Sequence, residues 1–327
     1  MMPVLKALWA GSSATLHVAR NLAFRALPGV SHGLLRLANV TGRGAGREGS
    51  SAADYFSAVV GDYEAMAEYT RVSGEGGLFR GRRVLELGLG NTRSVALLGR
   101  LKGAEQYAGF DPFDVQSRDR AYLSTVYEPL LERHREPGGM ARAEALLSDV
   151  PVHTTREALL SGGRRFDLVL SRAVLEHVSD LEGLFRDLAA VTVPGAVHLH
   201  KVDLRSHGNQ WDHELDFLLF PEGLYRAMAS HTGLPNRVRV DGYLDLVRRH
   251  GLALLHASAT RWIEPAAVEA LRPRLPPSFR EKPASVLSVL GVWLVLVGPE
   301  HPLAPRGITA LDAEALPRAP AERLSVY

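Results

Sequence analysis

Residues 83–92 read Arg-Val-Leu-Glu-Leu-Gly-Leu-Gly-Asn-Thr, and residues 107–112 read Tyr-Ala-Gly-Phe-Asp-Pro. The first stretch is an apolar run that ends in two glycines, after which Asn91 or Thr92 can cap a helix. This order predicts a strand, a glycine turn and a helix. The second stretch predicts another strand, which ends at Asp111. Two strands joined through a helix in this way are typical of a doubly wound α/β sheet.

The glycine turn and Asp111 indicate a site for a cofactor that carries adenosine. Gly88 and Gly90 let a ligand approach the backbone, and a carboxylate at the tip of the second strand can accept hydrogen bonds from both ribose hydroxyls. Arg93 stands where a dinucleotide fingerprint requires a third glycine, which argues against an NAD-type oxidoreductase, kept here as an alternative. Glu86 is an acid at an apolar strand end, where a positively charged group of a ligand would stabilise it.

Residues 166–178 form a second informative block, Phe-Asp-Leu-Val-Leu-Ser-Arg-Ala-Val-Leu-Glu-His-Val. The block predicts a buried parallel strand that breaks into a helix. An amphipathic helix at 181–188, a Pro-Gly turn and a strand at 196–202 follow. With these motifs, residues 80–205 resemble the class I S-adenosylmethionine-dependent methyltransferases of the methyltransferase type 11 kind.

The resemblance implies an α/β fold with S-adenosylmethionine (SAM) as the cofactor. Its core would be a doubly wound, seven-stranded, mostly parallel, Rossmann-like sheet, preceded by an N-terminal helical extension. The last strand is expected near residues 286–297 and antiparallel to its neighbours. This apolar run is the longest of the chain, and it is shorter than the ~20 residues of a transmembrane helix.

The resemblance also implies roles for single residues. It implies that the methionine part of the cofactor is lined by the acid and the two glycines of the first stretch, Glu86, Gly88 and Gly90. Asp111 would bind the ribose, and Ser171 with Arg172 would lie beside the sulfonium. The family has an acid after the third strand that contacts the adenine amino group. Here Glu157 or the earlier Asp149 could serve, and both stay open.

The chain divides into three parts by composition. Residues 1–50 form a basic extension and linker, residues 51–298 the methyltransferase domain, and residues 299–327 a tail rich in proline and alanine. Substrate-side elements are expected at 112–145 and 203–240. The first of these is longer than one crossover needs: it is a lid or a solvated crossover, with a charged helix that Pro129 interrupts.

The N-terminal extension has a strong charge bias, with six basic residues and no acid before Glu48. Residues 15–27 place their polar and apolar side chains on opposite faces of a predicted helix. Such a helix either packs on the protein or rests on an anionic membrane surface, so peripheral membrane contact through residues 1–40 is one expectation. A further helix at 54–72 is expected to cover the cofactor site.

Composition is that of a soluble enzyme. The chain has 327 residues, of which 46% are hydrophobic, enough to bury a large α/β core. A net charge of +2 without basic tracts argues against a nucleic-acid partner. There are no cysteines, which excludes disulfides and thiolate metal sites. We expect a cytoplasmic protein, with possible contact to the membrane surface.

The region after the fifth strand is expected to carry the acceptor chemistry, because ligands of open α/β sheets bind beyond the carboxyl ends of the strands. His207 is the predicted general base and Asp203 the group that orients it, since histidine titrates in the useful range. His177, after the fourth strand, is the reserve base. Each could instead be structural: Asp203 could cap the strand and pair with Arg205, and His207 could be a turn residue.

Two further interpretations concern the same region. Asn236, Arg237 and Arg239 are predicted to bind an anionic group of the acceptor, or else to pair with acids of the preceding loop. A metal site is not expected. The histidines and acids that could form one belong to a central strand and the loop after it, where histidines are often hydrogen-bonded core residues: His198, His200, Asp203, His207 and His213.

The function predicted from these patterns is methyl transfer from SAM to a small-molecule, glycan-linked or lipid-linked acceptor. Oxygen is favoured over nitrogen or carbon as the methylated atom. The alternative is a catalytically silent methyltransferase-like binding protein, whose motifs would look the same. The sequence gives neither the acceptor nor the oligomeric state.

Overall fold

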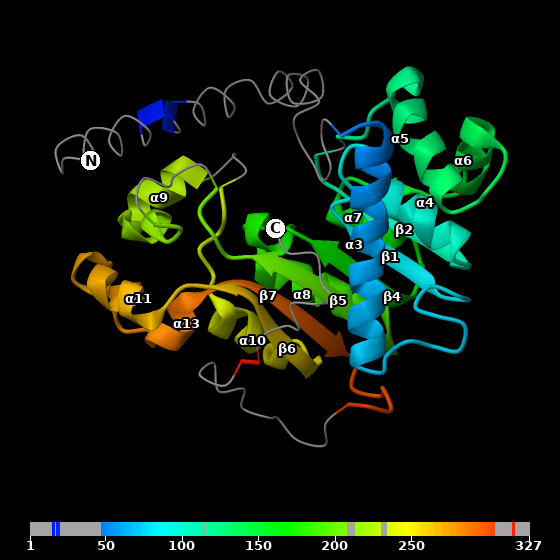
Figure 1. The fold of residues 1–327 in the computed structure, drawn as a ribbon. Helices are drawn as coiled ribbons and strands as arrows, with labels where there is room; N and C mark the ends of the chain where they lie inside the picture. The colour runs from blue at the N-terminus through cyan, green and yellow to red at the C-terminus, as the bar shows by residue number, and fades with distance from the viewer. Residues whose placement is uncertain are drawn as a thin grey trace.

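The first quoted stretch forms the middle of a seven-stranded sheet (Figure 1). The computed structural model describes most of the chain, namely residues 15–16, 18–19, 47–113, 115–207, 213–229, 234–304 and 316–317. The strands stand in the order β3-β2-β1-β4-β5-β7-β6. Their bounds are β1 Arg83–Leu87, β2 Gln106–Phe110, β3 Val152–His153, β4 Phe166–Arg172, β5 Thr192–Asp203, β6 Ala253–Trp262 and β7 Val289–Val297.

Strand directions agree with the predicted sheet. Strands β1 to β5 pair in parallel, and β7 runs antiparallel to both β5 and β6. All nine residues of β7 are buried, which explains the continuous apolar run. Strand β5 is longer than predicted, because Thr192 already pairs with Phe166 before a register shift. The predicted fold class is confirmed.

The turn after β1 has the predicted strand–turn–helix form, with α4 at Ser94–Leu101. Gly88 and Gly90 adopt positive φ angles of 65° and 71°. Arg93, at the third-glycine position, also adopts a left-handed conformation, with φ of 46°. The backbone therefore keeps the geometry that glycine adopts freely, although the side chain is large.

The segment after β4 differs from the predicted helix. Ala173 is left-handed with φ of 52°, and only a short 3₁₀ turn, η1 (Leu175–His177), follows. The next helix is α8 (Leu181–Val191), whose N-cap Asp180 accepts a hydrogen bond from the Gly183 N–H. The Glu-His pair of the motif thus lies on a tight turn at the carboxyl end of β4.

Helices cover both faces of the sheet. One face packs against α3 (Gly49–Tyr69), α4, α5 (Arg120–Arg133) and α6 (Gly139–Leu147). The other packs against α7 (Arg156–Ser161), α8 and α10 (Val240–Arg249). Figure 1 shows α3 crossing the sheet. Helix α3 occupies most of the predicted 54–72 helix, and it buries residues along its whole length against this face.

Pro129 does not interrupt helix α5, so the prediction of a break there is wrong. The reason is tertiary packing. Val126, Tyr127, Leu130 and Leu131 are all buried on either side of the proline. Burial of these side chains stabilises the helix by more than is lost through the one backbone hydrogen bond that proline, which has no N–H, cannot donate.

A separate group of short helices lies beside the sheet, away from α4 to α6 (Figure 1). It consists of η2 (Asp216–Leu219), α9 (Glu222–Ala229), α11 (Pro265–Leu271), η3 (Arg272–Arg274), α12 (Pro277–Arg280) and α13 (Ala284–Ser288). A hydrophobic cluster that includes Phe217, Tyr225 and Phe279 holds the group together. Part of the expected substrate-side region 203–240 therefore belongs to this second core.

Little of the N-terminal extension is described. Of the predicted helix at 15–27 only four residues are included, and among these Val18 packs against the cluster of short helices while Leu16 is exposed. The rest of the extension and most of the tail, 305–315 and 318–327, lie outside the described residues. In the part of the chain that is described, no helix is long and apolar enough to cross a membrane.

Candidate active site

Residues 88–92, the cofactor turn, connect β1 to α4 at the carboxyl edge of the sheet. The Gly88 N–H donates to the carbonyl of Phe110, the last residue of β2, at 2.9 Å. This bond joins the turn to Asp111, which is 5% exposed and accepts a hydrogen bond from the Phe113 N–H. The predicted glycine turn and the predicted ribose acid are thus adjacent, as one adenosine-bearing ligand requires.

Gly88 lies close to the segment that follows β4. A Cβ atom at Gly88 would lie 2.5 Å from Cγ2 of Val174, which is far inside van der Waals contact. Only a glycine fits here without displacing Val174. The contact also shows that the turn carrying Glu176 and His177 lies next to the cofactor turn.

Helix α5 braces the cofactor turn from outside. The amide of Asn91 donates to the hydroxyl of Tyr122 at 2.9 Å, and the hydroxyl of Tyr127 donates to the carbonyl of Thr92. Burial raises the pKa of Tyr127 to about 12, so it stays a neutral donor. Part of the expected 112–145 element therefore supports the turn at which the cofactor is predicted to bind.

Glu86 is fully buried at the end of β1, as predicted for an acid inside an apolar strand end. Its carboxylate accepts a hydrogen bond from the hydroxyl of Tyr107 on β2 at 2.9 Å. The Tyr107 hydroxyl therefore already provides part of the stabilisation that Glu86 was expected to receive from a charged group of the ligand. Tyr107 was not recognised from the sequence as part of this site.

Ser171 and Arg172 point to opposite faces of β4. The Ser171 hydroxyl bonds to Nδ1 of His200 on β5 at 2.7 Å, and both residues are fully buried. Arg172 forms a buried ion pair with Asp62 of α3 at 2.7 Å. The geometry supports a role for Arg172 in holding α3 on the sheet, and its contact with the cofactor stays a prediction.

Lys201 joins the Arg172–Asp62 pair from β5, at 3.9 Å from the Asp62 carboxylate. Burial, together with the neighbouring Arg172, lowers the pKa of Lys201 to about 8. Two basic side chains therefore share one buried acid beneath α3. Asp62 is a partner that the sequence pattern did not indicate, because it lies more than a hundred residues from Arg172.

The two candidates for the adenine-contacting acid lie in different surroundings. Asp149 pairs with Arg100 of α4 at 3.1 Å. Glu157 is exposed in the first turn of α7, directly after β3. Because Glu157 follows the carboxyl end of a strand beside β2, its position matches the expected contact better.

His198 and His200 share one face of β5, as the alternation of a strand predicts. Both are fully buried, with ring centroids 5.8 Å apart. Burial lowers the pKa of His198 to about 4 and that of His200 well below its ordinary value, so both are neutral near pH 7. His198 and His200 are therefore core residues, whereas His207 is more exposed.

At the carboxyl end of β5, Asp203 holds two partners. Arg205 donates to both of its carboxylate oxygens, at 2.8 and 2.6 Å, and Nε2 of His207 lies 3.5 Å from Oδ2. These bonds hold the pKa of the Asp203 carboxyl well below its usual range despite its burial. The predicted pairing of His207 with Asp203 is therefore present in the geometry, together with the alternative pairing of Asp203 with Arg205.

His177 and His207, the reserve and the first candidate base, lie together. Their ring centroids are 4.9 Å apart. Glu176, the neighbour of His177 in the chain, is 1% exposed and accepts a hydrogen bond from the Asp203 N–H at 3.3 Å. We call these four residues, Glu176, His177, Asp203 and His207, the histidine cluster.

Glu176 is a site residue that sequence analysis missed. Burial raises the pKa of its carboxyl well above the ordinary value. Among the described residues, Glu176, His177 and His207 form a group that could hold a metal ion, since one ligand atom from each lies within 4.8 Å of the others. The signal for Glu176 in the sequence is the Leu-Glu-His-Val motif, in which an acid directly precedes His177.

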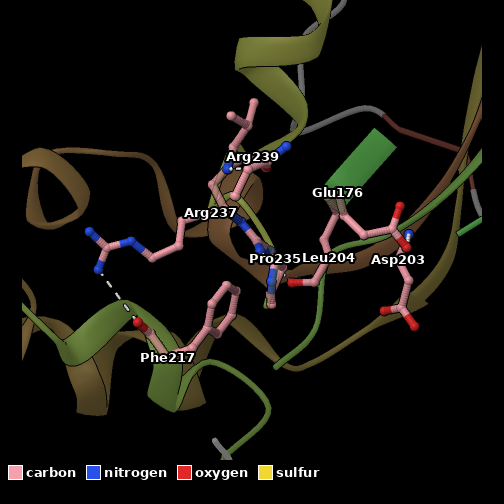
Figure 2. A pocket seen from close by; sticks show the side chains of 9 residues that line it. Glu176, Asp203, Leu204, Phe217, Pro235, Arg237 and Arg239 are labelled. Carbon is pink, nitrogen blue, oxygen red and sulfur yellow. Dashed lines mark hydrogen bonds between the residues drawn. The ribbon is translucent and has the colours of Figure 1, made fainter. Parts of the chain in front are cut away.

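Asn236, Arg237 and Arg239 line a narrow crevice beside the histidine cluster. Figure 2 shows Glu176 and Asp203 at one end of it and Phe217 with Arg237 at the other. The crevice leaves no room even for a water molecule, so no acceptor occupies it in this conformation.

The polar groups of this segment bind to the protein itself. The Asn236 amide donates to the carbonyls of Leu175 and Val178, and so clamps the turn that carries Glu176. Arg239, 1% exposed, donates to three backbone carbonyls, those of Leu204, Leu287 and Val289.

Arg237 lies beside Tyr225 and Phe279 and pairs with Glu222. This is the predicted alternative of pairing with an acid, although Glu222 belongs to α9. Acceptor binding by Asn236, Arg237 and Arg239 stays a prediction, and their observed contacts are structural.

Comparison with known proteins agrees with this geometry. A family model described as a methyltransferase domain matches residues 60–257, more than half of the chain. The chain therefore belongs to the class I SAM-dependent methyltransferases. Its cofactor is SAM, and membership decides against the oxidoreductase alternative. No curated protein matches the chain.

Solved structures with similar folds include a SAM-dependent methyltransferase from Mesorhizobium loti, at 17% identity and a TM-score of 0.39, covering 72% of this chain and 99% of the other. Another is a cyclopropane-fatty-acyl-phospholipid synthase-like protein from Lactobacillus casei, at 15% identity and 0.44, covering 82% and 98%. A third is magnesium protoporphyrin IX methyltransferase from Synechocystis PCC 6803 with bound SAH, at 13% identity and 0.38, covering 75% and 82%.

Residues of this chain fit the family's cofactor. The close approach at Gly88 and the buried acid at Asp111 provide the two features that a methionine chain and a ribose need.

Proposed function

We propose that the protein transfers the methyl group of SAM to a hydroxyl oxygen of a small-molecule, glycan-linked or lipid-linked acceptor. The observation that carries this proposal is the position of the histidine cluster. His177 and His207 are half-buried and lie side by side, and the turn that carries His177 lies next to the cofactor turn. A hydroxyl placed at this cluster would lie near the methyl donor and near groups that can take up its proton.

We assign the cofactor to the carboxyl edge around the cofactor turn. Glu86, Gly88 and Gly90 would surround the methionine part, and Asp111 would accept the ribose hydroxyls. Ser171 with Arg172 would lie beside the sulfonium, and Glu157 would reach the adenine. When bound, SAM supplies a methyl group on a positively charged sulfur that needs no further activation.

The acceptor side would then control the rate. A hydroxyl is a poor nucleophile near neutral pH, so the reaction is faster when the proton leaves as the new bond forms. The carbon–oxygen bond forms, the carbon–sulfur bond breaks in line with it, and the proton passes to the histidine cluster. His207, oriented by Asp203, is the predicted proton acceptor, with His177 in reserve. The enclosed site would add orientation of the two reactants.

The acceptor would enter near the group of short helices. Residues 213–229 join that group to the loop after β5, so this second core forms part of the wall that a substrate meets. Asn236 and Arg237 stand between the two regions and would contribute through the shape of the wall.

Metabolite comparison tests this proposal. Extracts of a strain that lacks the gene, incubated with purified protein and SAM carrying a labelled methyl group, should yield a labelled product with the methyl on oxygen. Cleavage of the product by reagents specific for methyl ethers or methyl esters identifies the atom. A label on nitrogen or carbon would contradict the proposal, and so would SAM binding without any transfer.

A further inference from the structure

We propose that Glu176, His177 and His207 bind a divalent transition-metal ion, which takes the acceptor hydroxyl as a further ligand. The sequence predicted no metal site, and of the histidines it considered, His198 and His200 are buried in the sheet, whereas His207 lies beside two residues it did not consider for a metal, Glu176 and His177. The three proposed ligands come from the turn after β4 and from the loop after β5.

The distances within this group suit a metal after a small closing movement. One ligand atom from each residue lies within 4.8 Å of the others. A tetrahedral ion with bonds of about 2.1 Å places its ligand atoms roughly 3.4 Å apart. Because His177 and His207 are only half-buried, rotation of their side chains can supply the difference.

The donor set also points to a catalytic metal. Two imidazoles and one carboxylate suit Zn²⁺ and similar transition metals better than Mg²⁺ or Ca²⁺, which prefer oxygen ligands. Three protein ligands leave at least one position for water or substrate. The group lies beside the cofactor turn, where an acceptor atom has to be held.

Glu176 provides an independent observation. It is 1% exposed; its Oε1 accepts a hydrogen bond from the Asp203 N–H, whereas its Oε2 has no hydrogen-bond partner among the described residues. A buried carboxyl oxygen without a partner is costly. A cation bound at this oxygen would remove that cost.

Asp203 acts as the outer partner of the proposed site. Its carboxylate lies 3.5 Å from Nε2 of His207 and is itself held by Arg205 through two hydrogen bonds. Histidines that bind metals usually donate their other ring N–H to a carboxylate, which fixes the ring and the tautomer. In this arrangement His207 presents Nδ1 to the ion.

The consequence for catalysis rests on the proposed function. A hydroxyl bound to a divalent cation has a lowered pKa and loses its proton to solvent more readily. The oxygen then attacks the methyl carbon as the carbon–sulfur bond breaks. With the ion bound, His207 is a ligand and not the base, so the ion replaces the role that the sequence predicted for His207.

Calorimetric titration of the chelator-treated, full-length protein with ZnCl₂ and with MnCl₂ tests the site. We expect saturable binding of one ion per chain to the wild type. His177→Ala, His207→Ala and Glu176→Gln should each raise the dissociation constant by at least about 100-fold, the upper end of the range seen for outer-sphere partners. Asp203→Asn, as a positioning change, should raise it about 10-fold.

Two controls keep the result specific. His250→Ala removes a histidine that is not part of the histidine cluster and pairs with Glu182 at 2.8 Å, and this variant should bind metal as the wild type does. Thermal unfolding of each variant without metal shows that it is folded. Saturating metal should raise the melting temperature of the wild type and of His250→Ala, and not of Glu176→Gln.

The outcomes separate this inference from the proposed function. Absence of one-to-one binding, or equal affinity in the wild type and the three ligand variants, overturns the metal site even if methyl transfer to oxygen continues in chelator. Cluster-dependent binding supports the metal site even if the product carries its methyl group on nitrogen or carbon, a result that overturns only the proposed function.

Discussion

The cofactor turn and the histidine cluster lie side by side but are built in different ways. The cofactor turn comes from one short stretch, and its shape is a property of the backbone, with positive φ at Gly88, Gly90 and Arg93. The histidine cluster is assembled from side chains of two segments, η1 and the end of β5 with the loop after it.

The two regions therefore place different requirements on the amino-acid sequence. The cofactor turn tolerates little change of shape, because a Cβ at Gly88 already meets Val174. The histidine cluster depends on a set of charges and hydrogen bonds, in which Asp203 connects Glu176, Arg205 and His207. Steric changes should therefore disrupt the first region, and changes in proton or charge balance the second.

The largest effect is expected for Gly88→Val. Its Cβ would lie 2.5 Å from Val174 Cγ2, and φ of 65° is unfavourable for a branched side chain, so SAM binding should be lost. Calorimetry with SAM measures the loss. Gly61→Ala is the matched control, because nothing lies within 4 Å of a Cβ at that position, and it should bind normally. Wild-type binding by a folded Gly88→Val protein would contradict the placement of the cofactor.

His207→Ala should lower kcat by ~10²-fold or more, whether His207 takes up the proton of the acceptor or holds the proposed ion, while SAM affinity stays nearly unchanged. The reason is that His207 lies at the acceptor side and not at the cofactor turn. Steady-state rates on the true acceptor, with separate SAM titration, measure both quantities. Normal kcat in His207→Ala with loss in His177→Ala would exchange their roles.

Asp111→Ala should weaken SAM binding roughly 10- to 100-fold, because it removes a buried partner of the ribose hydroxyls. Asp111→Asn keeps one acceptor oxygen, so its SAM affinity should lie between those of Asp111→Ala and the wild type. Affinities from calorimetry provide the comparison. If Asp111→Ala binds as the wild type does, the ribose lies elsewhere.

The smallest expected effect concerns His198, a buried histidine of β5, and appears only in acid. The pKa of His198 is about 4 in the folded protein against 6.5 in the unfolded chain, so the unfolded state takes up a proton first as the pH falls. The contribution of His198 to the free energy of unfolding is therefore lost between pH 6.5 and pH 4, by roughly 3 kcal/mol.

Urea denaturation at several pH values checks this expectation. Between pH 6.5 and pH 4, the free energy of unfolding of His198→Leu should fall by roughly 3 kcal/mol less than that of the wild type. Near pH 8 the free energies of unfolding of the two proteins should differ only through packing. An identical acid dependence of both proteins would show that His198 is not the group responsible.

Much of the fold could be predicted from local patterns, since the strand–turn–helix at 83–101 and the apolar run of β7 are short-range signals. The break at Pro129 was predicted wrongly, because burial of Tyr127 and its neighbours outweighs the missing hydrogen bond. The cofactor acids and glycines follow one another along the chain. Their proximity could therefore be anticipated.

The acceptor side could be predicted only in part. His207 and Asp203 are four residues apart, so their pairing was accessible from the sequence. The anchoring of Arg239 could not be predicted, because its partners Leu287 and Val289 stand 48 and 50 residues further along the chain. The contact of Glu176 with Asp203 likewise depends on β4 and β5 lying side by side.

Methyl transfer to oxygen at the histidine cluster can be followed with a labelled methyl group. SAM with a ¹³C-labelled methyl group is incubated with the acceptor and with wild-type or His207→Ala protein, and the product is observed by NMR. We expect an O-methyl signal in the wild type and a rate at least ~10²-fold lower in the variant. A methyl signal on nitrogen or carbon, or equal rates in both proteins, would contradict methyl transfer to oxygen at this cluster.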